Sequence, residues 1–151
     1  MSKLNDFIKT RTPAFWLLCL SAVFVLIGLI FALVSCSAPN GAYRMLNQGV
    51  FIALSIIAIV VIAGILVAGA FLEEKLWMSI LPVVVIVLLG FSIYILFMGK
   101  MDLMGTIWFS ELDRGNAVAE SALNNGVVGL VFYVLAALAL GIGCCFRFSK
   151  D

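Results

Sequence analysis

The sequence predicts an all-α integral membrane protein, a four-helix bundle with both termini in the cytoplasm. The 151-residue chain is 65% hydrophobic and 11% charged, whereas soluble domains are about half apolar and about a quarter charged. Its charges fall between four long apolar runs that contain no Asp, Glu, Lys or Arg. A water-soluble fold of this length cannot bury so much apolar surface, so we expect a single membrane domain over residues 1–151.

Each apolar run is long enough for one membrane-spanning helix. A helix rises about 1.5 Å per residue, so about 20 residues cross the hydrocarbon core. The runs are continuously apolar rather than alternating, which predicts helices and not barrel strands. The expected spans are residues 13–34, 50–72, 76–98 and 127–146. Pro82 lies inside the third span and is expected to disturb or slightly kink that helix.

Two short segments flank these spans on the predicted cytoplasmic side. Within residues 2–11, Leu4, Phe7 and Ile8 recur at helical spacing among polar residues, which predicts a short amphipathic helix at the membrane surface. This helix is either a docking arm for a partner or, as we favour, a lead-in to the first span. Thr12 is expected to cap that span, and residues 73–75 connect spans two and three as an antiparallel hairpin.

The distribution of Lys and Arg predicts the orientation. The termini and residues 73–75 carry six of these residues, and the two segments on the opposite side carry three. Because cytoplasmic loops are enriched in positive charge, the six-residue side is expected to be cytoplasmic. The predicted location is the plasma membrane, with several passes through the bilayer.

The segment between the third and fourth spans, residues 99–126, is the one sizeable polar piece of the chain. Asn116 is expected to cap a helix from Ala117 to Leu123, which either ends at Asn124–Gly126 or runs unbroken into the fourth span. Loops carry binding functions more often than spans do. The candidate partner contacts are Trp108, Phe109, Glu111, Asp113, Arg114, Asn116 and Glu120. The alternative interpretation is a solvated lid whose charges pair with one another.

Several function classes receive no support from the composition. Histidine is absent and no C-x-x-C pair occurs, which argues against haem, most catalytic zinc sites and thioredoxin-type chemistry. The predicted spans hold no ionisable residue of the kind that marks a proton relay or ion pathway. With a net charge of +1, we expect no nucleic-acid partner. We expect no cofactor, no metal and no enzymatic activity. A weaker alternative is a lipid-handling enzyme at the outer interface that uses Glu111, Asp113 or Glu120 as an acid or base.

The cysteines permit two further interpretations. Leu33–Cys36 resembles the cleavage site of a bacterial lipoprotein signal, with Cys36 as the lipidated residue. The preceding apolar run is about 20 residues, longer than the 7–15 of a signal peptide, so we favour an uncleaved span. Cys144 and Cys145 are juxtamembrane positions that can be acylated, but free packed thiols are the expected state in a reducing cytoplasm.

Small residues recur at four-residue spacing in three of the predicted spans. This pattern allows helices to approach closely. The candidate packing residues are Gly28, Ala32, Gly64, Ala68, Ala137 and Gly141. The pattern fits contacts within one chain, which we favour, and contacts between the chains of a homo-oligomer.

The sequence thus predicts a non-enzymatic protein that works through contacts with protein or lipid. The favoured hypothesis is an accessory, assembly or scaffold subunit of a larger membrane complex, whose partners are the lipid bilayer and another membrane protein. The alternative is an oligomeric channel or carrier for an apolar or neutral solute.

Overall fold

The computed structural model describes residues 13–37, 45, 47–71, 76–109 and 113–146. This part of the chain is helical and contains no strand. The helices are α2 (Pro13–Cys36), α3 (Gln48–Phe71), α4 (Leu76–Met104), the π-helical segment η2 (Gly105–Phe109) and α5 (Ala117–Gly143). Four of the helices are long and apolar enough to cross a membrane. The protein is therefore described as a multi-pass helical membrane protein.

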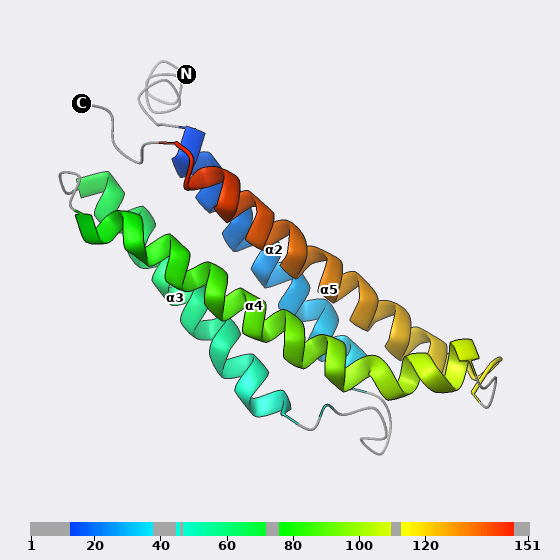
Figure 1. The fold of residues 1–151 in the computed structure, drawn as a ribbon. Helices are drawn as coiled ribbons and strands as arrows, with labels where there is room; N and C mark the ends of the chain where they lie inside the picture. The colour runs from blue at the N-terminus through cyan, green and yellow to red at the C-terminus, as the bar shows by residue number, and fades with distance from the viewer. Residues whose placement is uncertain (1–12, 38–44, 46, 72–75, 110–112, 147–151) are drawn as a thin grey trace, which may run out of the picture.

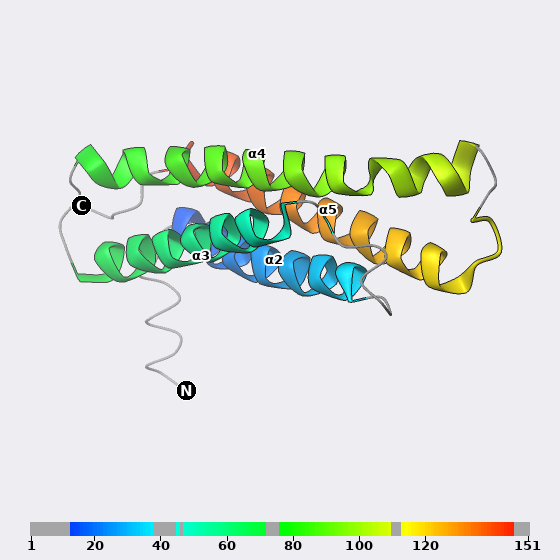
Figure 2. The same cartoon turned by 90° about the horizontal axis from the view of Figure 1, so that it is seen from below.

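The four long helices run side by side, as Figures 1 and 2 show. Gly143 near the end of α5 lies beside Ala14 and Leu17 at the start of α2, so the first and last helices are antiparallel. We call this end of the bundle the proximal end. The opposite end, where α2 ends and α3 begins, is the distal end. Which of the two faces the cytoplasm stays a prediction from the charge distribution.

A single stripe of each helix is buried, and its residues follow a seven-residue repeat. In α2 the buried positions are Ala14, Leu18, Ser21, Val25, Gly28, Ala32 and Ser35, together with Cys36. In α5 they are Ala119, Ala122, Leu123, Gly126, Gly129, Tyr133, Ala136, Ala139, Leu140 and Gly143. Alternating steps of three and four residues keep one stripe of a helix facing its neighbour, as in left-handed helix pairs. The buried stripes of both helices are rich in small residues, which allows close approach.

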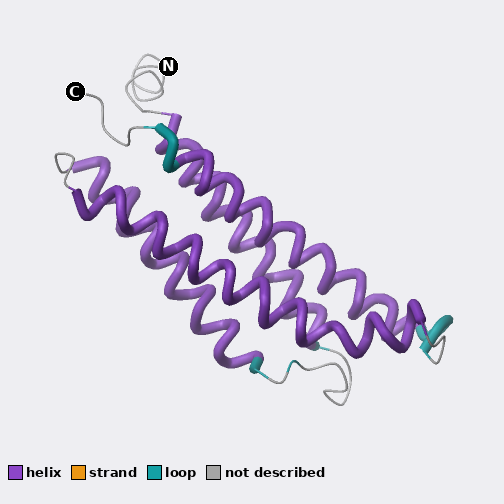
Figure 3. Tube along the Cα trace, viewed as in Figure 1, coloured by secondary structure: helices purple, strands orange, loops and turns teal. Residues whose placement is uncertain are grey.

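Helices α2 and α5 form the tightest pair of the bundle, which we call the α2–α5 seam. Small residues of the two helices meet at intervals of seven residues, linked by backbone contacts or by serine hydroxyls that donate to carbonyls. From the proximal to the distal end the pairs are Ala14–Gly143, Ser21–Ala136, Gly28–Gly129 and Ser35–Ala122. Helix α4 packs against α3 and α5, and α3 also contacts α2, which closes the bundle (Figure 3).

Two of the long helices extend beyond the expected third and fourth spans, and the helix expected from Ala117 runs into the fourth span, as one of the two alternatives had it. Helix α4 continues past residue 98 to Met104, and η2 extends it to Phe109. Helix α5 begins at Ala117, ten residues before the expected start of the fourth span, and runs unbroken through Asn124–Gly126. The segment of residues 99–126 is therefore mainly the continuation of two helices. The first two spans agree with α2 and α3 to within two residues at each end.

Lys100, Asp102 and Glu120, which lie outside the expected uncharged spans, are nevertheless helical and belong to α4 and α5. A helix does not have to end where an apolar run ends, because a charged side chain is accommodated wherever it finds a partner. Lys100 is only 2% exposed, and its Nζ donates a hydrogen bond to the Ser35 carbonyl oxygen at 3.2 Å. Helix α4 is also continuous through the buried Pro82.

Some predictions fall outside the described residues. These are the amphipathic helix of residues 2–11, the cap at Thr12, the connection of residues 73–75 and the candidate contact Glu111.

Candidate functional site

The distal ends of α4 and α5 project beyond the ends of α2 and α3 (Figure 2). We call residues 103–109 and 113–125 the distal hairpin. It has a small apolar core of its own, made by Leu103, Ile107, Ala119, Ala122 and Leu123, with Met104 and Val127 packed against it. The hydrogen bond from Lys100 to the Ser35 carbonyl oxygen places Lys100 at the level of the end of α2. The nine residues from there to Phe109 correspond to about 13 Å of helix.

Two aromatic side chains are exposed on η2 near the tip of this projection. Trp108 is 58% exposed and Phe109 is 85% exposed, the largest value for a large apolar side chain among the described residues. Burial of such a side chain stabilises a complex by about 1.5–3 kcal/mol. On the spans, exposed apolar residues face lipid, but the tip extends beyond the two shorter helices. Adjacent exposed aromatic residues at such a place are typical of a docking surface.

The turn before α5 is held by local hydrogen bonds. The Asn116 side chain accepts hydrogen bonds from the backbone N–H groups of Val118 and Ala119, at 3.2 and 3.4 Å. The Gly115 N–H donates to Glu120 Oε1 at 2.9 Å, and Gly115 has a φ of 85°, a conformation that favours glycine. The cap predicted at Asn116 is present. Asn116 and Glu120 are therefore occupied in shaping the turn that connects η2 to α5.

The turn is also tied to η2 by its backbone. The Asp113 N–H donates to the Thr106 carbonyl oxygen at 3.4 Å, and the Asn116 N–H donates to the Asp113 carbonyl oxygen at 3.1 Å. Asp113 is half-buried, whereas Arg114 is exposed. Of the predicted contact residues, the structure thus places Trp108, Phe109, Arg114 and Asn116 in exposed positions on the distal hairpin. The side chains of Asn116 and Glu120 have a structural role within it.

At the base of the distal hairpin, Lys100 joins α4 to the end of α2. Besides the bond to the Ser35 carbonyl, its side chain lies beside the Cys36 thiol. The space for its stem comes from Gly126, where an added Cβ would lie 3.2 Å from Lys100 Cγ. The ammonium group stands at the C-terminus of α2, where unpaired carbonyls and the helix dipole favour a positive charge.

Sequence reasoning missed this cluster and placed Lys100 in the polar outer segment. Its position in the buried stripe of α4 could have been predicted from the residue spacing. Lys100 follows the buried Leu96 by four residues and precedes the buried Leu103 by three, so it continues the core stripe of α4. Cys36, the residue that would be lipidated in the lipoprotein interpretation, belongs to the same cluster and is only 3% exposed.

A second polar contact lies in the middle of the bundle. The Tyr133 hydroxyl of α5 and the Ser55 hydroxyl of α3 are 2.5 Å apart, and Ser55 also donates to the Phe51 carbonyl oxygen at 2.8 Å. Tyr133 therefore acts as the donor to Ser55. Both side chains are fully buried, and the pair satisfies the polar groups that the apolar interior would otherwise isolate.

The six predicted packing residues have different environments. Gly28 and Ala32 lie buried in the α2–α5 seam. An added Cβ at Gly64 or Gly141 would meet nothing within 4 Å, so these two glycines are not positions of close approach, and Ala68 and Ala137 are half-buried. The close-packed glycines of α5 are instead Gly126 and Gly129, because the buried stripe of α5 runs one position away from Ala137 and Gly141.

Comparison of the chain with protein-family models, with curated proteins and with solved structures finds no match.

Proposed function

We propose that the protein docks onto another membrane protein through the distal hairpin and serves as an accessory, assembly or scaffold subunit of a larger complex in the plasma membrane. The observation that carries this proposal is the exposure of Trp108 and Phe109 on a projection beyond α2 and α3. Aromatic residues are the commonest anchors of protein interfaces. The hydrogen-bonded turn behind them holds the surface in one shape, which lowers the entropy lost on binding.

The interior of the bundle supports a contact role over conduction through the chain. In the α2–α5 seam an added Cβ at Gly129 would lie 3.1 Å from the Gly28 carbonyl oxygen, so the two backbones are nearly in contact. The buried serines of the seam donate to carbonyls across it. In this proposal the protein is not an enzyme, and its activity is recognition.

An oligomeric channel or carrier is the weaker alternative. An oligomer of this kind needs the small-residue stripes for contacts between chains. Gly28 and Ala32, however, already pack against α5 within the chain. Gly64 of α3 and Gly141 of α5 are the members of the predicted stripes with open space around them.

The proposal is tested by removing the two aromatic side chains together. The double variant Trp108→Ala, Phe109→Ala is expressed in native membranes, extracted in mild detergent and purified, and bound protein is quantified by mass spectrometry. Loss of two interface anchors is expected to reduce a stoichiometric partner by more than about tenfold.

The matched control is the double variant Trp16→Ala, Phe146→Ala, which removes two exposed aromatic residues near the proximal end. It is expected to recover the partner at the wild-type level. Equal recovery by both double variants, or a wild-type protein that carries no stoichiometric partner in its native membrane, would contradict docking through the distal hairpin.

A further inference from the structure

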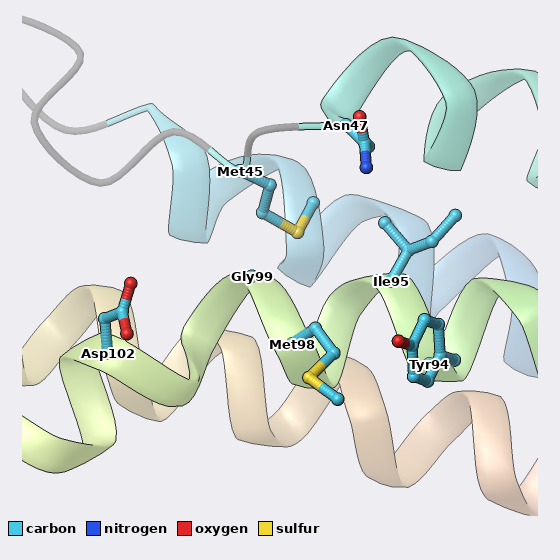
Figure 4. Close-up of a pocket in the computed structure, with 7 residues that line it drawn as sticks. All are labelled: Met45, Asn47, Tyr94, Ile95, Met98, Gly99 and Asp102. Carbon is cyan, nitrogen blue, oxygen red and sulfur yellow. The ribbon is translucent and has the colours of Figure 1, made fainter.

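Two hollows lie along one face of α4 and share Tyr94. The distal hollow, of about 430 Å³, lies between α4 and the segment that precedes α3, and its polar groups belong to Asn47, Tyr94 and Asp102. Figure 4 shows Met45 and Asn47 on one side of it and the α4 residues on the other. The second hollow, of about 350 Å³, continues toward the middle of the span and is lined by Val87, Gly90, Phe91 and Tyr94. Together we call them the α4 groove.

Two glycines shape this groove. Gly90 leaves a gap between larger neighbours, and an added Cβ there would meet nothing within 4 Å. At the distal end, Met45 packs directly on Gly99, where an added Cβ would lie 2.7 Å from Met45 Cγ. This contact fixes Met45 against α4, and Met45 forms part of one wall of the distal hollow. The distal hollow thus lies where Met45 packs on α4, whereas the second hollow lies on the surface of α4 alone.

The polarity of the groove changes along its length. Val87, Phe91, Tyr94, Met98 and Asp102 follow one another at steps of three or four residues, so they lie along one face of α4. The inner part is apolar apart from the Tyr94 hydroxyl, and the distal part holds a carboxylate and an amide. An amphiphile is the kind of ligand that matches such a gradient.

The length of the groove fits one leaflet of a bilayer. Val87 and Asp102 are fifteen residues apart, which corresponds to about 22 Å of helix. A leaflet with its headgroups is half of a bilayer, or about 20–22 Å. Between Ile80 and Gly99 helix α4 contains no charged residue, and the first charges follow at Lys100 and Asp102. The distal hollow therefore lies where the apolar part of the span gives way to polar residues, the level of the lipid headgroups.

We propose that the α4 groove binds a single phospholipid whose headgroup carries a primary ammonium. The ammonium pairs with the Asp102 carboxylate, the Asn47 amide and Tyr94 hydroxyl donate to the phosphate, and an acyl chain crosses Gly90 between Val87 and Phe91. Asp102 is the one charged residue among the described residues that line the groove, so a purely anionic headgroup meets repulsion there. This proposal does not depend on docking through the distal hairpin, because Trp108 and Phe109 lie outside the groove.

The acyl-chain part is tested by filling the gap at Gly90. The full chain is reconstituted in nanodiscs that hold equal amounts of palmitoyl-oleoyl phosphatidylethanolamine and phosphatidylglycerol, and retained lipid is counted by native mass spectrometry. Gly90→Leu is expected to retain less phosphatidylethanolamine than wild type. Gly64→Leu, at an exposed glycine of α3 that also has open space around its Cβ, is the matched control and is expected to retain the wild-type amount. Equal retention by the two variants would overturn the assignment of the tail to the α4 groove.

The headgroup part is tested by Asp102→Asn in the same mixture. Wild type is expected to prefer phosphatidylethanolamine over phosphatidylglycerol, and the variant is expected to lose about two- to fivefold of that preference, the factor that one exposed ion pair contributes. Asp113→Asn, which removes an acid from the turn before α5, is the control and keeps the preference. No preference in wild type would overturn the proposal, as would an unchanged preference in Asp102→Asn.

A second copy of the chain is the competing occupant of the same groove. Gly90→Cys is treated with a short thiol crosslinker in the nanodiscs, in a background where Cys19, Cys36, Cys144 and Cys145 are replaced by Ala. The expected product is the monomer. Efficient crosslinking to a dimer would show that another protein covers Gly90, and it would overturn the lipid assignment.

Discussion

Gly28 and Gly129 lie opposite each other in the α2–α5 seam, so close that neither position has room for a side chain. A Cβ added to Gly129 would lie 3.1 Å from the Gly28 carbonyl oxygen and 3.2 Å from the Ala32 nitrogen. A Cβ added to Gly28 would lie 2.7 Å from the Tyr133 ring. Backbone atoms and a buried ring cannot move aside without separating the helices. This pair therefore sets the distance between the first and last helices.

Gly28→Ala is expected to lower the free energy of unfolding by about 1–3 kcal/mol, because the added methyl group overpacks the seam. Gly64→Ala is the matched control, since it adds the same group at an open position of α3 and gains helix propensity. Thermal unfolding of both variants in mild detergent measures the difference. Equal melting temperatures would show that the seam is not closely packed.

Lys100→Met keeps most of the volume of the side chain but removes the ammonium group that binds the Ser35 carbonyl oxygen. Loss of a hydrogen bond from a charged donor is expected to lower the free energy of unfolding by about 1.5–3 kcal/mol. The end of α2 should then open more often and expose Cys36, which is 3% exposed in the folded protein.

The rate of maleimide labelling at Cys36 measures this opening, and the exposed Cys145 provides the reference rate in the same sample. Faster labelling of Cys36 in Lys100→Met, at an unchanged rate for Cys145, is the expected result. A labelling ratio equal to that of wild type would mean that Lys100 does not hold the end of α2.

Tyr133 contributes through its ring more than through its hydroxyl group. Tyr133→Phe removes the hydrogen bond to Ser55, and such contacts between membrane helices contribute about 0.6 kcal/mol on average. Tyr133→Ala also empties the space beside Gly28 and Phe51 and is expected to lower the free energy of unfolding by about 3–5 kcal/mol. Chemical unfolding in detergent separates the two effects. Similar losses in both variants would assign the stability to the polar pair instead.

Asn116→Ala is expected to loosen the start of α5 without unfolding the bundle. The cap contributes about 1 kcal/mol, so amide hydrogen exchange at Val118 and Ala119 should become about fivefold faster. Asn124→Ala, at an exposed position of the same helix, is the control and should leave exchange at these two amides unchanged. Wild-type exchange in Asn116→Ala would show that the turn is held by other contacts.

The sequence was sufficient to predict four long helices, because apolar runs free of charge have few other structures available in lipid. It was not sufficient to predict where α4 ends, and it left open whether the helix from Ala117 runs into the fourth span. Hydropathy falls at Lys100, but the helix continues because Ser35 and Cys36 of another helix receive the side chain. Such a partner is separated from Lys100 by more than sixty residues, and no local pattern identifies it.

The buried faces were hard to predict for a related reason. In a soluble helix the polar face identifies the outside, whereas here the lipid-facing side is as apolar as the core. Residue size is the remaining difference, because small residues line the seam and large ones face outward. Small-residue spacing alone selected Gly28 and Ala32, which lie in the seam, but also Gly64 and Gly141, which do not. The Asn116 cap was predictable because it depends on neighbouring residues only.

The antiparallel pairing of α2 with α5 has a consequence for biosynthesis. Ser21 donates to the Ala136 carbonyl oxygen across 115 residues of sequence, so α2 pairs with a helix that is synthesised after both α3 and α4. Until α5 has been inserted, α2 stands in the bilayer with its glycine and serine stripe uncovered, and closing so long a loop is entropically unfavourable. The tertiary fold is therefore completed only after α5 has been inserted, and a chain truncated before α5 would present this stripe to the quality-control proteases of the membrane.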